Sequence, residues 1–361
     1  MDKPKINLIL DSGAFSAFTQ GVPINLDKYA KFILDNQKHL YYPVNLDVIN
    51  PGNGELAAEM GYKNFLTLKS KGIESMPVYH QYETLKWLDL MLEESEGYIG
   101  LSSSMTSNTE AVNWYNILFN YLTDTKGYPI AKFHAFGDST QVSTLNYPWF
   151  SIDSATWAQG GGRAGRTIIR GRTYQLGAKT RRVDRENLEE DDKSLAQELI
   201  SIGVDPVKLF DKNQKHYSRK LTMVRMYMFI RHFLELEKKC PLTYKGGAKL
   251  LVGNKVAKYA AGWLGNKARE EWKVSRPCKM FFGVTGSPAV FLPSLMMAGV
   301  ENILISFFYV TPASWNMVLE FLYDPLKTCQ EHKKVKDYWN QLQEVMINPG
   351  EIQYMEKKVL V

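Results

Sequence analysis

The chain has 361 residues, of which 45% are hydrophobic, and carries a formal net charge of +6. This length can bury a large core in one domain with a sizeable insertion, and the mild excess of positive charge favours an anionic partner. Three widely separated cysteines (Cys240, Cys278 and Cys329) exclude a disulfide framework and a closely spaced cysteine metal site. With neither a signal peptide nor a run of 18 uncharged apolar residues, we expect a soluble cytoplasmic protein that does not enter a membrane.

Short apolar segments alternate with helical patterns along the first part of the chain. Helical spacing of apolar residues recurs in segments such as 26–40, 55–72, 83–95 and 108–124. Between these segments we expect six strands, at 5–10, 41–49, 76–82, 97–104, 128–139 and 147–157. Such alternation predicts parallel strands joined by helical crossovers.

The alternation is interrupted between about 165 and 276, where long helical patterns, runs of charge and one strand-like piece, RTIIRGRTYQL, occur. It resumes with two more strands, at 279–286 and 302–310. Eight strands predict a (β/α)8 TIM barrel, which takes about 250 residues, with a helical and basic insertion between strands six and seven. The alternative is an open doubly wound sheet, but no GxGxxG follows the first strand.

The predicted elements divide the chain into four parts. Residues 1–165 would form barrel strands one to six, and residues 166–275 the helical basic insertion, which would bind nucleic acid. Residues 276–345 would add strands seven and eight, and residues 346–361 would be a C-terminal tail.

Acidic residues follow several of the expected strands. Asp11 ends the first, Asp47 lies near the end of the second and Asp153 near the end of the sixth. Catalytic groups of a TIM barrel lie at these carboxyl ends, so we expect the three carboxylates to meet at one rim. Clustered carboxylates of this kind supply a nucleophile and a general acid/base. The alternative is that each is only a helix cap or a turn residue.

Two acid-free runs carry the positive charge. The first follows three glycines, Gly160 to Gly162, that either approach a phosphate or form a hinge. The alternative to nucleic-acid binding is a solvated charged surface, balanced by the neighbouring RENLEEDDK. The candidate phosphate contacts are Arg163, Arg166, Arg170, Arg172, Arg181 and Arg182 in the first run, and Lys215, Arg219 and Lys220 in the second.

Two motifs carry a resemblance to a known family. LDSGAFSAF resembles the Asp-Ser-Gly-Gly-Phe signature of the tRNA-guanine transglycosylases, which have a (β/α)8 barrel. SIDSATWAQGGGRAGR, with RAGR ten residues after Asp153, resembles that family's nucleophilic aspartate and its following Thr-Arg-x-x-Arg segment. The order of Asp-Ser-Gly, an Asp after strand two, a Gln after strand three and Gly-Leu after strand four also agrees over about 170 residues.

The resemblance implies a role for each matching residue. Asp153 would be the nucleophile that attacks C1′ and expels guanine, and Asp11 the general acid/base. Asp47 would accept hydrogen bonds from the guanine N1–H and amino group. The remaining candidates for base binding are Phe15, by stacking, and Gln81, Gly100, Leu101 and His134. Base exchange of this kind requires no redox or nucleotide cofactor, and we expect no bound metal.

The chain also departs from that family. The closely spaced cysteines of the family's zinc site are missing, Ala14 stands where the signature has its second glycine, and the insertion has no counterpart. These departures favour the DNA-guanine transglycosylases of the DpdA type, often encoded by phages, which place a 7-deazaguanine (preQ0-type) base in DNA. The chain would then act in the host cytoplasm on a flipped or single-stranded nucleotide. The alternatives are the same reaction on tRNA, an unrelated barrel hydrolase, or a barrel that binds nucleic acid without chemistry.

Overall fold

The computed structural model describes residues 3–50, 52–103, 108–162, 165–169, 172–176, 190–246, 278–284 and 287–348. The first part of the chain alternates strands and helices as expected. Its elements are β1 (Asn7–Asp11), α1 (Ala14–Gln20), α2 (Leu26–Asn36), η1 (Gln37–His39), β2 (Tyr42–Pro43), α3 (Gly54–Ser70), β3 (Val78–His80), α4 (Leu85–Glu94), β4 (Tyr98–Ser102), α5 (Asn108–Tyr121), β5 (Lys132–Phe136), α6 (Gln141–Asn146), β6 (Ser151–Ser154) and α7 (Thr156–Gly162).

The insertion and the last part of the chain follow. The insertion contributes β7 (Arg166–Ile169), β8 (Arg172–Gln175), α8 (Glu190–Ser201), α9 (Pro206–Phe210) and α10 (Tyr217–Glu237). The barrel then continues with β9 (Lys279–Val284), η2 (Pro288–Val290), α13 (Leu292–Ala298), β10 (Asn302–Ser306), η3 (Phe307–Tyr309), α14 (Pro312–Tyr323), α15 (Pro325–Glu331) and α16 (Lys336–Gln343).

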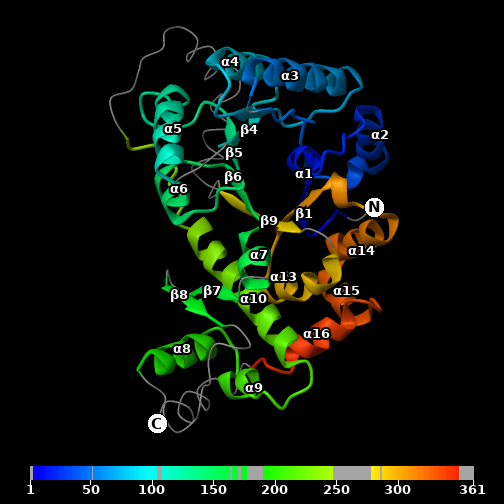
Figure 1. The fold of residues 1–361 in the computed structure, drawn as a ribbon, viewed down its shortest axis with the longest axis vertical. Coiled ribbons are helices and arrows are strands. Elements are labelled where there is room, and N and C mark those ends of the chain that lie inside the picture. Colours follow the sequence, from blue (N-terminus) through cyan, green and yellow to red (C-terminus); the bar gives the residue numbers. More distant parts are fainter. Residues whose placement is uncertain are drawn as a thin grey trace.

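Eight parallel strands form one curled sheet, in the order β2-β1-β10-β9-β6-β5-β4-β3 (Figure 1). The two edge strands of this order are β2 and β3. Val44, just after β2, and Met76, just before β3, form a parallel bridge between these two edges. There the N–H of Asn45 donates to the Met76 carbonyl at 2.8 Å, and the N–H of Met76 donates to the Pro43 carbonyl at 2.9 Å. The fold is therefore a TIM-barrel-like (β/α)8 arrangement, and the prediction of this fold is confirmed.

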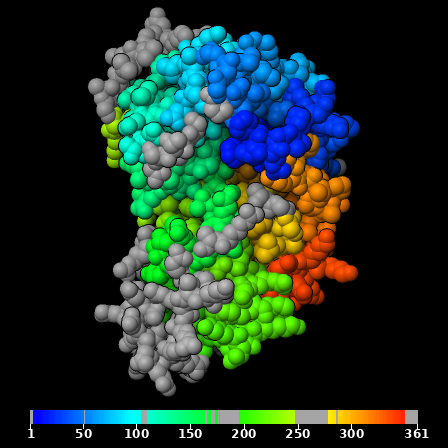
Figure 2. Space-filling model, in the orientation of Figure 1, coloured from blue at the N-terminus to red at the C-terminus, as the bar shows by residue number. Residues whose placement is uncertain are grey.

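The strands are apolar on both faces, which suits a parallel sheet covered by helices. In β1, the side chain of Ile9 belongs to an interior cluster that includes Val44, Val78, Phe281 and Leu304. The neighbouring side chains of β1 belong to the layers between strands and helices. The register of β1 with β10, which pairs Asp11 with Ser306, places the first and last strands of the sheet side by side. Figure 2 shows the same closeness, with blue atoms of the N-terminal part beside orange atoms of the segment around α14.

The insertion lies between β6 and β9, as predicted, but it is not purely helical. RTIIRGRTYQL forms two strands instead of one, because β7 pairs antiparallel with β8 and Arg166 lies opposite Gln175. The long helix α10 packs on α7 and α13 and runs from beside α16 to beside α6 (Figure 1). Within the described residues, no helix is long and apolar enough to cross a membrane.

The three glycines after Asp153 belong to α7 and pack against α10. A Cβ on Gly161 would lie 2.9 Å from the backbone nitrogen of Met226, and one on Gly160 would lie 3.0 Å from the ring of Phe229. Buried Arg225 holds the same junction, since its guanidinium donates to the carbonyls of Gly161, at 2.7 Å, and Leu176, at 2.6 Å. Close helix packing thus accounts for Gly160 and Gly161.

Candidate active site

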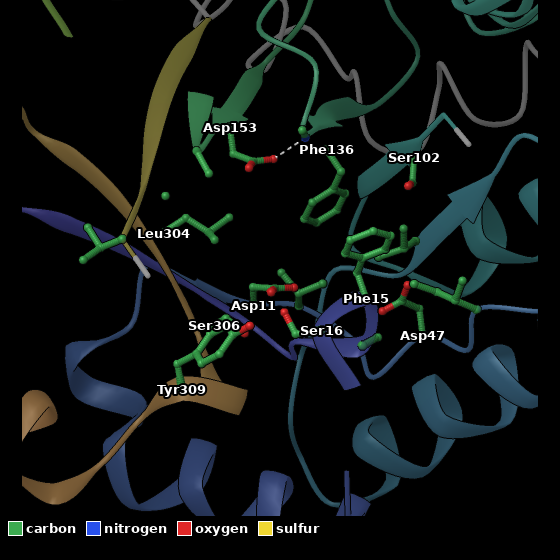
Figure 3. A pocket seen from close by; sticks show the side chains of 18 of the residues that line it. Asp11, Phe15, Ser16, Asp47, Ser102, Phe136, Asp153, Leu304, Ser306 and Tyr309 are labelled. Carbon is green, nitrogen blue, oxygen red and sulfur yellow. Dashed lines mark hydrogen bonds between the residues drawn. The ribbon is translucent and has the colours of Figure 1, made fainter. Parts of the chain in front are cut away.

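A cavity of about 380 Å³ opens at the carboxyl ends of the barrel strands. Asp11, Asp47 and Asp153 all line it, although they belong to three different parts of the chain, and Figure 3 shows them around one hollow. Parallel strands of a barrel end at the same rim, and this is what brings the three carboxylates together. The other lining residues are mostly small, apolar or aromatic: Ala14, Phe15, Ser16, Val44, Ile49, Val78, Ser102, Ser103, Phe136, Gly137, Ala155, Gly283, Val284, Leu304, Ser306 and Tyr309.

The Asp-Ser-Gly motif forms a tight turn between β1 and α1. The N–H of Gly13 donates to Oδ2 of Asp11 at 3.1 Å, which orients the carboxylate. Gly13 adopts φ +84°, in the left-handed region, and a Cβ there would lie 2.5 Å from Phe308 and Ser306. Only glycine fits this position, because other residues are strained at such φ values and have no room here.

The Asp11 carboxyl has a strongly perturbed proton affinity. Burial, followed by the charges of Asp47 and Asp153, raises its pKa from 3.8 to about 7, and the Gly13 N–H offsets part of this rise. A carboxyl with this pKa is partly protonated at neutral pH, so it can both give and accept a proton. Burial and the neighbouring carboxylates thus bring the pKa of Asp11 into the range that acid/base chemistry at neutral pH requires.

The Asp153 side chain is fixed through one of its two oxygens. Oδ1 accepts a hydrogen bond of 2.8 Å from the N–H of Gly137 and one of 3.3 Å from Nε2 of His134. His134 is itself held at Nδ1 by the Ser151 hydroxyl, 2.6 Å away, which bonds in turn to the Tyr98 hydroxyl. Among the described residues no group hydrogen-bonds Oδ2, so this oxygen is left for a ligand in the cavity.

Asp47 is part of a buried charge network. Nε2 of His80 donates to its Oδ2 at 3.0 Å, while the Ser12 hydroxyl makes a longer bond of 3.4 Å to Oδ1. Nδ1 of His80 donates to Oε1 of Glu83 at 2.8 Å. Burial alone would lower the pKa of His80, but the two carboxylates outweigh burial and raise it to about 9. His80 is therefore a cation at neutral pH and balances the charge of Asp47.

Two phenylalanines shape the apolar side of the cavity. Phe15 from α1 is 68% exposed and points into the hollow between Asp11 and Asp47 (Figure 3). Phe136 at the end of β5 lies across from it. Its ring occupies the space left by Gly100, where a Cβ would lie only 2.2 Å from the ring. An exposed aromatic ring at a cavity mouth is suited to stacking on a flat ligand.

Four of the residues predicted to bind the base do not line the cavity. Leu101 is fully buried in the core, and Gly100 lies behind Phe136. The N–H of Gln81 donates to the Ser102 carbonyl at 3.1 Å, and the preceding residue, His80, reaches Asp47 instead. His134 is buried beneath Asp153, so it positions the carboxylate. These four residues therefore lie outside the lining of this cavity.

The basic residues predicted to contact phosphate differ in their burial and in their partners. Lys220 is buried, bonds Gln214 at 2.8 Å and pairs closely with Glu344, so it is not free to bind phosphate. The Arg219 guanidinium lies over the ring of Tyr338 in α16, at 4.9 Å, and Lys215 is exposed before α10. On the hairpin, Arg166 is exposed, and Arg172 lies in β8. Outside the described residues lie Arg163, Arg170, Arg181 and Arg182.

The site also contains groups for which the sequence predicted no particular role. The Gly137 N–H and His80 engage two of the three aspartates, and Ser306, Ser102 and Tyr309 line the cavity. His80 does stand at the end of a predicted strand, and strand parity was the signal that could have favoured it over Gln81. Within the described residues, no group of three or more His, Cys, Asp or Glu side chains is arranged to hold a metal ion.

The fold and the cavity define a class of protein, a (β/α)8 barrel with a three-carboxylate site at the carboxyl ends of its strands. This arrangement pairs a carboxyl that titrates near neutral pH with a fixed carboxylate whose second oxygen faces the cavity. No family model matches the chain, and neither a characterised protein nor a solved structure matches it. Its function is therefore inferred from the geometry and chemistry of its own residues.

Proposed function

We propose that this chain is a base-exchanging transglycosylase that replaces guanine in DNA with a 7-deazaguanine base through a covalent aspartyl–glycosyl intermediate. One observation carries the proposal above the others. Asp11, with a pKa of about 7, shares a cavity with Asp153, whose Oδ2 is free of hydrogen bonds from the described residues. A general acid and a nucleophile are the two groups that retaining displacement at a sugar carbon requires.

In the first step, Oδ2 of Asp153 attacks C1′ of the target nucleotide and the bond from C1′ to guanine breaks. Protonated Asp11 gives its proton to the departing base. In the second step, the Asp11 carboxylate takes the proton from the ring nitrogen of the incoming 7-deazaguanine. That nitrogen attacks C1′, and Asp153 is released. The two displacements retain the configuration at C1′, and both catalytic groups return to their starting forms.

The base would be held by the remaining carboxylate and an aromatic ring. Asp47 offers acceptor oxygens to the N1–H and amino group of a guanine-like base, and His80 fixes its orientation. Phe15 would stack on the base from the exposed side. A cavity of about 380 Å³ lies in the usual range for small-molecule sites, about 300–1,000 Å³.

DNA is the polymer that we favour, because the basic insertion and the missing zinc cysteines separate the chain from the tRNA enzymes that it resembles. The C1′ atom of a paired nucleotide is shielded inside the duplex, so the target must be flipped out or single-stranded to reach the cavity.

The decisive experiment is incorporation of labelled guanine into duplex DNA and into tRNA. We expect label in DNA with the wild-type chain and none with Asp153→Asn. The matched control is Asp35→Asn, at an exposed aspartate that pairs with Lys31 on α2, which should keep full activity. A denaturing gel should also show a covalent protein–DNA adduct that Asp153→Asn does not form.

The other outcomes distinguish the alternatives. Label only in tRNA would assign the same chemistry to the other polymer. Release of guanine without incorporation would indicate a hydrolase. Nucleic-acid binding without exchange, equal in wild type and Asp153→Asn, would make the barrel a binding module and contradict the proposal.

A further inference from the structure

A second hollow, of about 570 Å³, lies in the insertion between α6, β7, α8 and α10. One face of α10 forms its floor. Met228 and Leu236 provide the apolar part, Arg231 and His232 provide polar groups on the helix, and Lys239 adds a third just beyond its C-terminal end. Gln141, at the start of α6, also lines the hollow. We call this hollow the α10 groove.

The α10 groove carries two free cations. Arg231 and Lys239 are exposed, and neither pairs with a described acid. Glu235 on the same face pairs with Lys238 at 2.6 Å, which takes up its charge. Burial, followed by the charge of Lys239, lowers the pKa of His232, so that ring is a neutral hydrogen-bonding group at pH 7. Glu198, half-buried on α8, is the other acid of the lining.

The groove begins close to the active cavity. Gly137 lines the cavity and holds Asp153, while Gln141, four residues later, lines the groove. Four residues span at most about 14 Å. In B-form DNA a strand carries one phosphate per about 3.4 Å along the axis, so the start of the groove lies within roughly four phosphates of the reacting nucleotide.

We propose that the α10 groove holds the sugar-phosphate backbone of the nucleic acid whose nucleotide enters the active cavity. The proposal rests on the proposed function, and it assigns the path of the flanking strand. Arg231 and Lys239 neutralise phosphates, and Gln141 and His232 donate neutral hydrogen bonds, which is the usual mixture of contacts to a backbone. The cations at the other end of α10 lie beside α16 and take no part: Arg219 is engaged with Tyr338, and Lys215 does not line the groove.

The test is the salt dependence of DNA binding, measured by fluorescence anisotropy with a short labelled duplex and its single strand. All proteins carry Asp153→Asn, so that no chemistry is needed. The groove variant is Arg231→Gln/Lys239→Gln. The matched control is Lys212→Gln/Lys215→Gln, which removes the same charge from exposed lysines outside the groove. Each phosphate contact contributes about 0.9 to the slope of log K against log salt on duplex DNA.

We expect the groove variant to lower the slope by about 2 between about 50 and 200 mM salt, and the control to leave it unchanged. An unchanged slope in the groove variant, or equal losses in both variants, would overturn the proposal. The two proposals also fail separately. If the wild-type chain exchanges guanine but the groove variant binds DNA with an unchanged salt slope, only the groove proposal is rejected. If the groove variant lowers the slope but the wild-type chain does not exchange guanine, only the proposed chemistry is rejected. If no nucleic acid binds at all, both are rejected.

Discussion

Nε2 of His80 lies 3.0 Å from Oδ2 of Asp47, and Nδ1 of the same ring lies 2.8 Å from Oε1 of Glu83. A histidine between two buried carboxylates is held in its charged form, because each carboxylate favours the imidazolium. His80 and Asp47 therefore form one ion pair. His80 compensates the charge of Asp47 and fixes the carboxylate at the cavity wall.

This relationship predicts a pH-dependent contribution to stability. The pKa of His80 is raised from 6.5 to about 9 in the folded protein. Its stabilising effect is therefore complete below about pH 6.5 and is lost as the pH rises through 9. Urea unfolding should show that His80→Gln lowers the free energy of unfolding by about 3 kcal/mol at pH 6, and by far less at pH 10.

The control for this prediction is His39→Gln. Burial and the charge of Lys38 lower the pKa of His39, so this histidine should show no loss of stabilisation with rising pH. A His80→Gln deficit that is equal at both pH values would show that the ring acts by packing alone.

The acid/base role of Asp11 predicts the pH dependence of guanine release. Protonated Asp11 is needed, so the single-turnover rate should fall above about pH 7, where the carboxyl loses its proton. The charge of Asp47 contributes to this raised pKa, so Asp47→Asn should move the decline to lower pH.

Glu237 provides a matched control for the pH profile. Its pKa is also raised by burial to about 7, but it accepts a hydrogen bond from Met280 at the start of β9 and does not line the cavity. Glu237→Gln should leave the profile unchanged. A decline at the same pH in wild type and Asp47→Asn would contradict the electrostatic coupling between the two aspartates.

The exposed ring of Phe15 predicts a loss of base binding on truncation. Stacking of a base on an aromatic ring is worth about 1–3 kcal/mol, so Phe15→Ala should raise KM for the free base roughly 5- to 150-fold. Phe15→Tyr should restore most of the affinity. Phe18→Ala, at another exposed phenylalanine of α1 that does not line the cavity, should have little effect. Equal KM values for the two alanine variants would exclude stacking on Phe15.

The close approach of Gly100 and Phe136 predicts that a larger residue at position 100 disturbs both stability and the cavity. Gly100→Ala would place a Cβ 2.2 Å from the Phe136 ring and push the ring into the cavity. Overpacking of this kind costs about 1–3 kcal/mol, so thermal unfolding should occur at lower temperature and KM should rise. Phe136→Leu in the same chain should recover stability. Gly162→Ala is the control, since its nearest neighbour would be the Met226 sulfur, 4.0 Å away.

Which side chains reach the cavity was only partly predictable. Asp11, Asp47 and Asp153 line it, as expected from their places at strand ends, and so does Phe15, which the family resemblance had implied. His80 stands at the end of the same predicted strand as Gln81, but only Gln81 was predicted to contact the base. Adjacent residues of a strand point to opposite sides, so an error of one position exchanges a site residue for one outside the site.

The same reason applies to the basic residues. In the chain, Arg219 and Lys220 look like equal members of a basic run, but on α10 one lies over Tyr338 and the other is buried against Glu344. Arg231 and Lys239 belong to no conspicuous run, yet both line the α10 groove. The face of a helix that stays accessible depends on what packs against it, and no local pattern records that.

The sequence by itself determined the alternation of strands and helices, the place of the insertion and the aspartates at the strand ends. These depend on local properties: the run of apolar residues in a buried strand, and the glycine at positive φ in the turn after Asp11. Only the tertiary structure decided which carboxylates share a cavity, which histidine pairs with which aspartate, and which cations remain unpaired. Those properties arise from distances between residues far apart in the chain, which burial and electrostatic coupling convert into altered proton affinities.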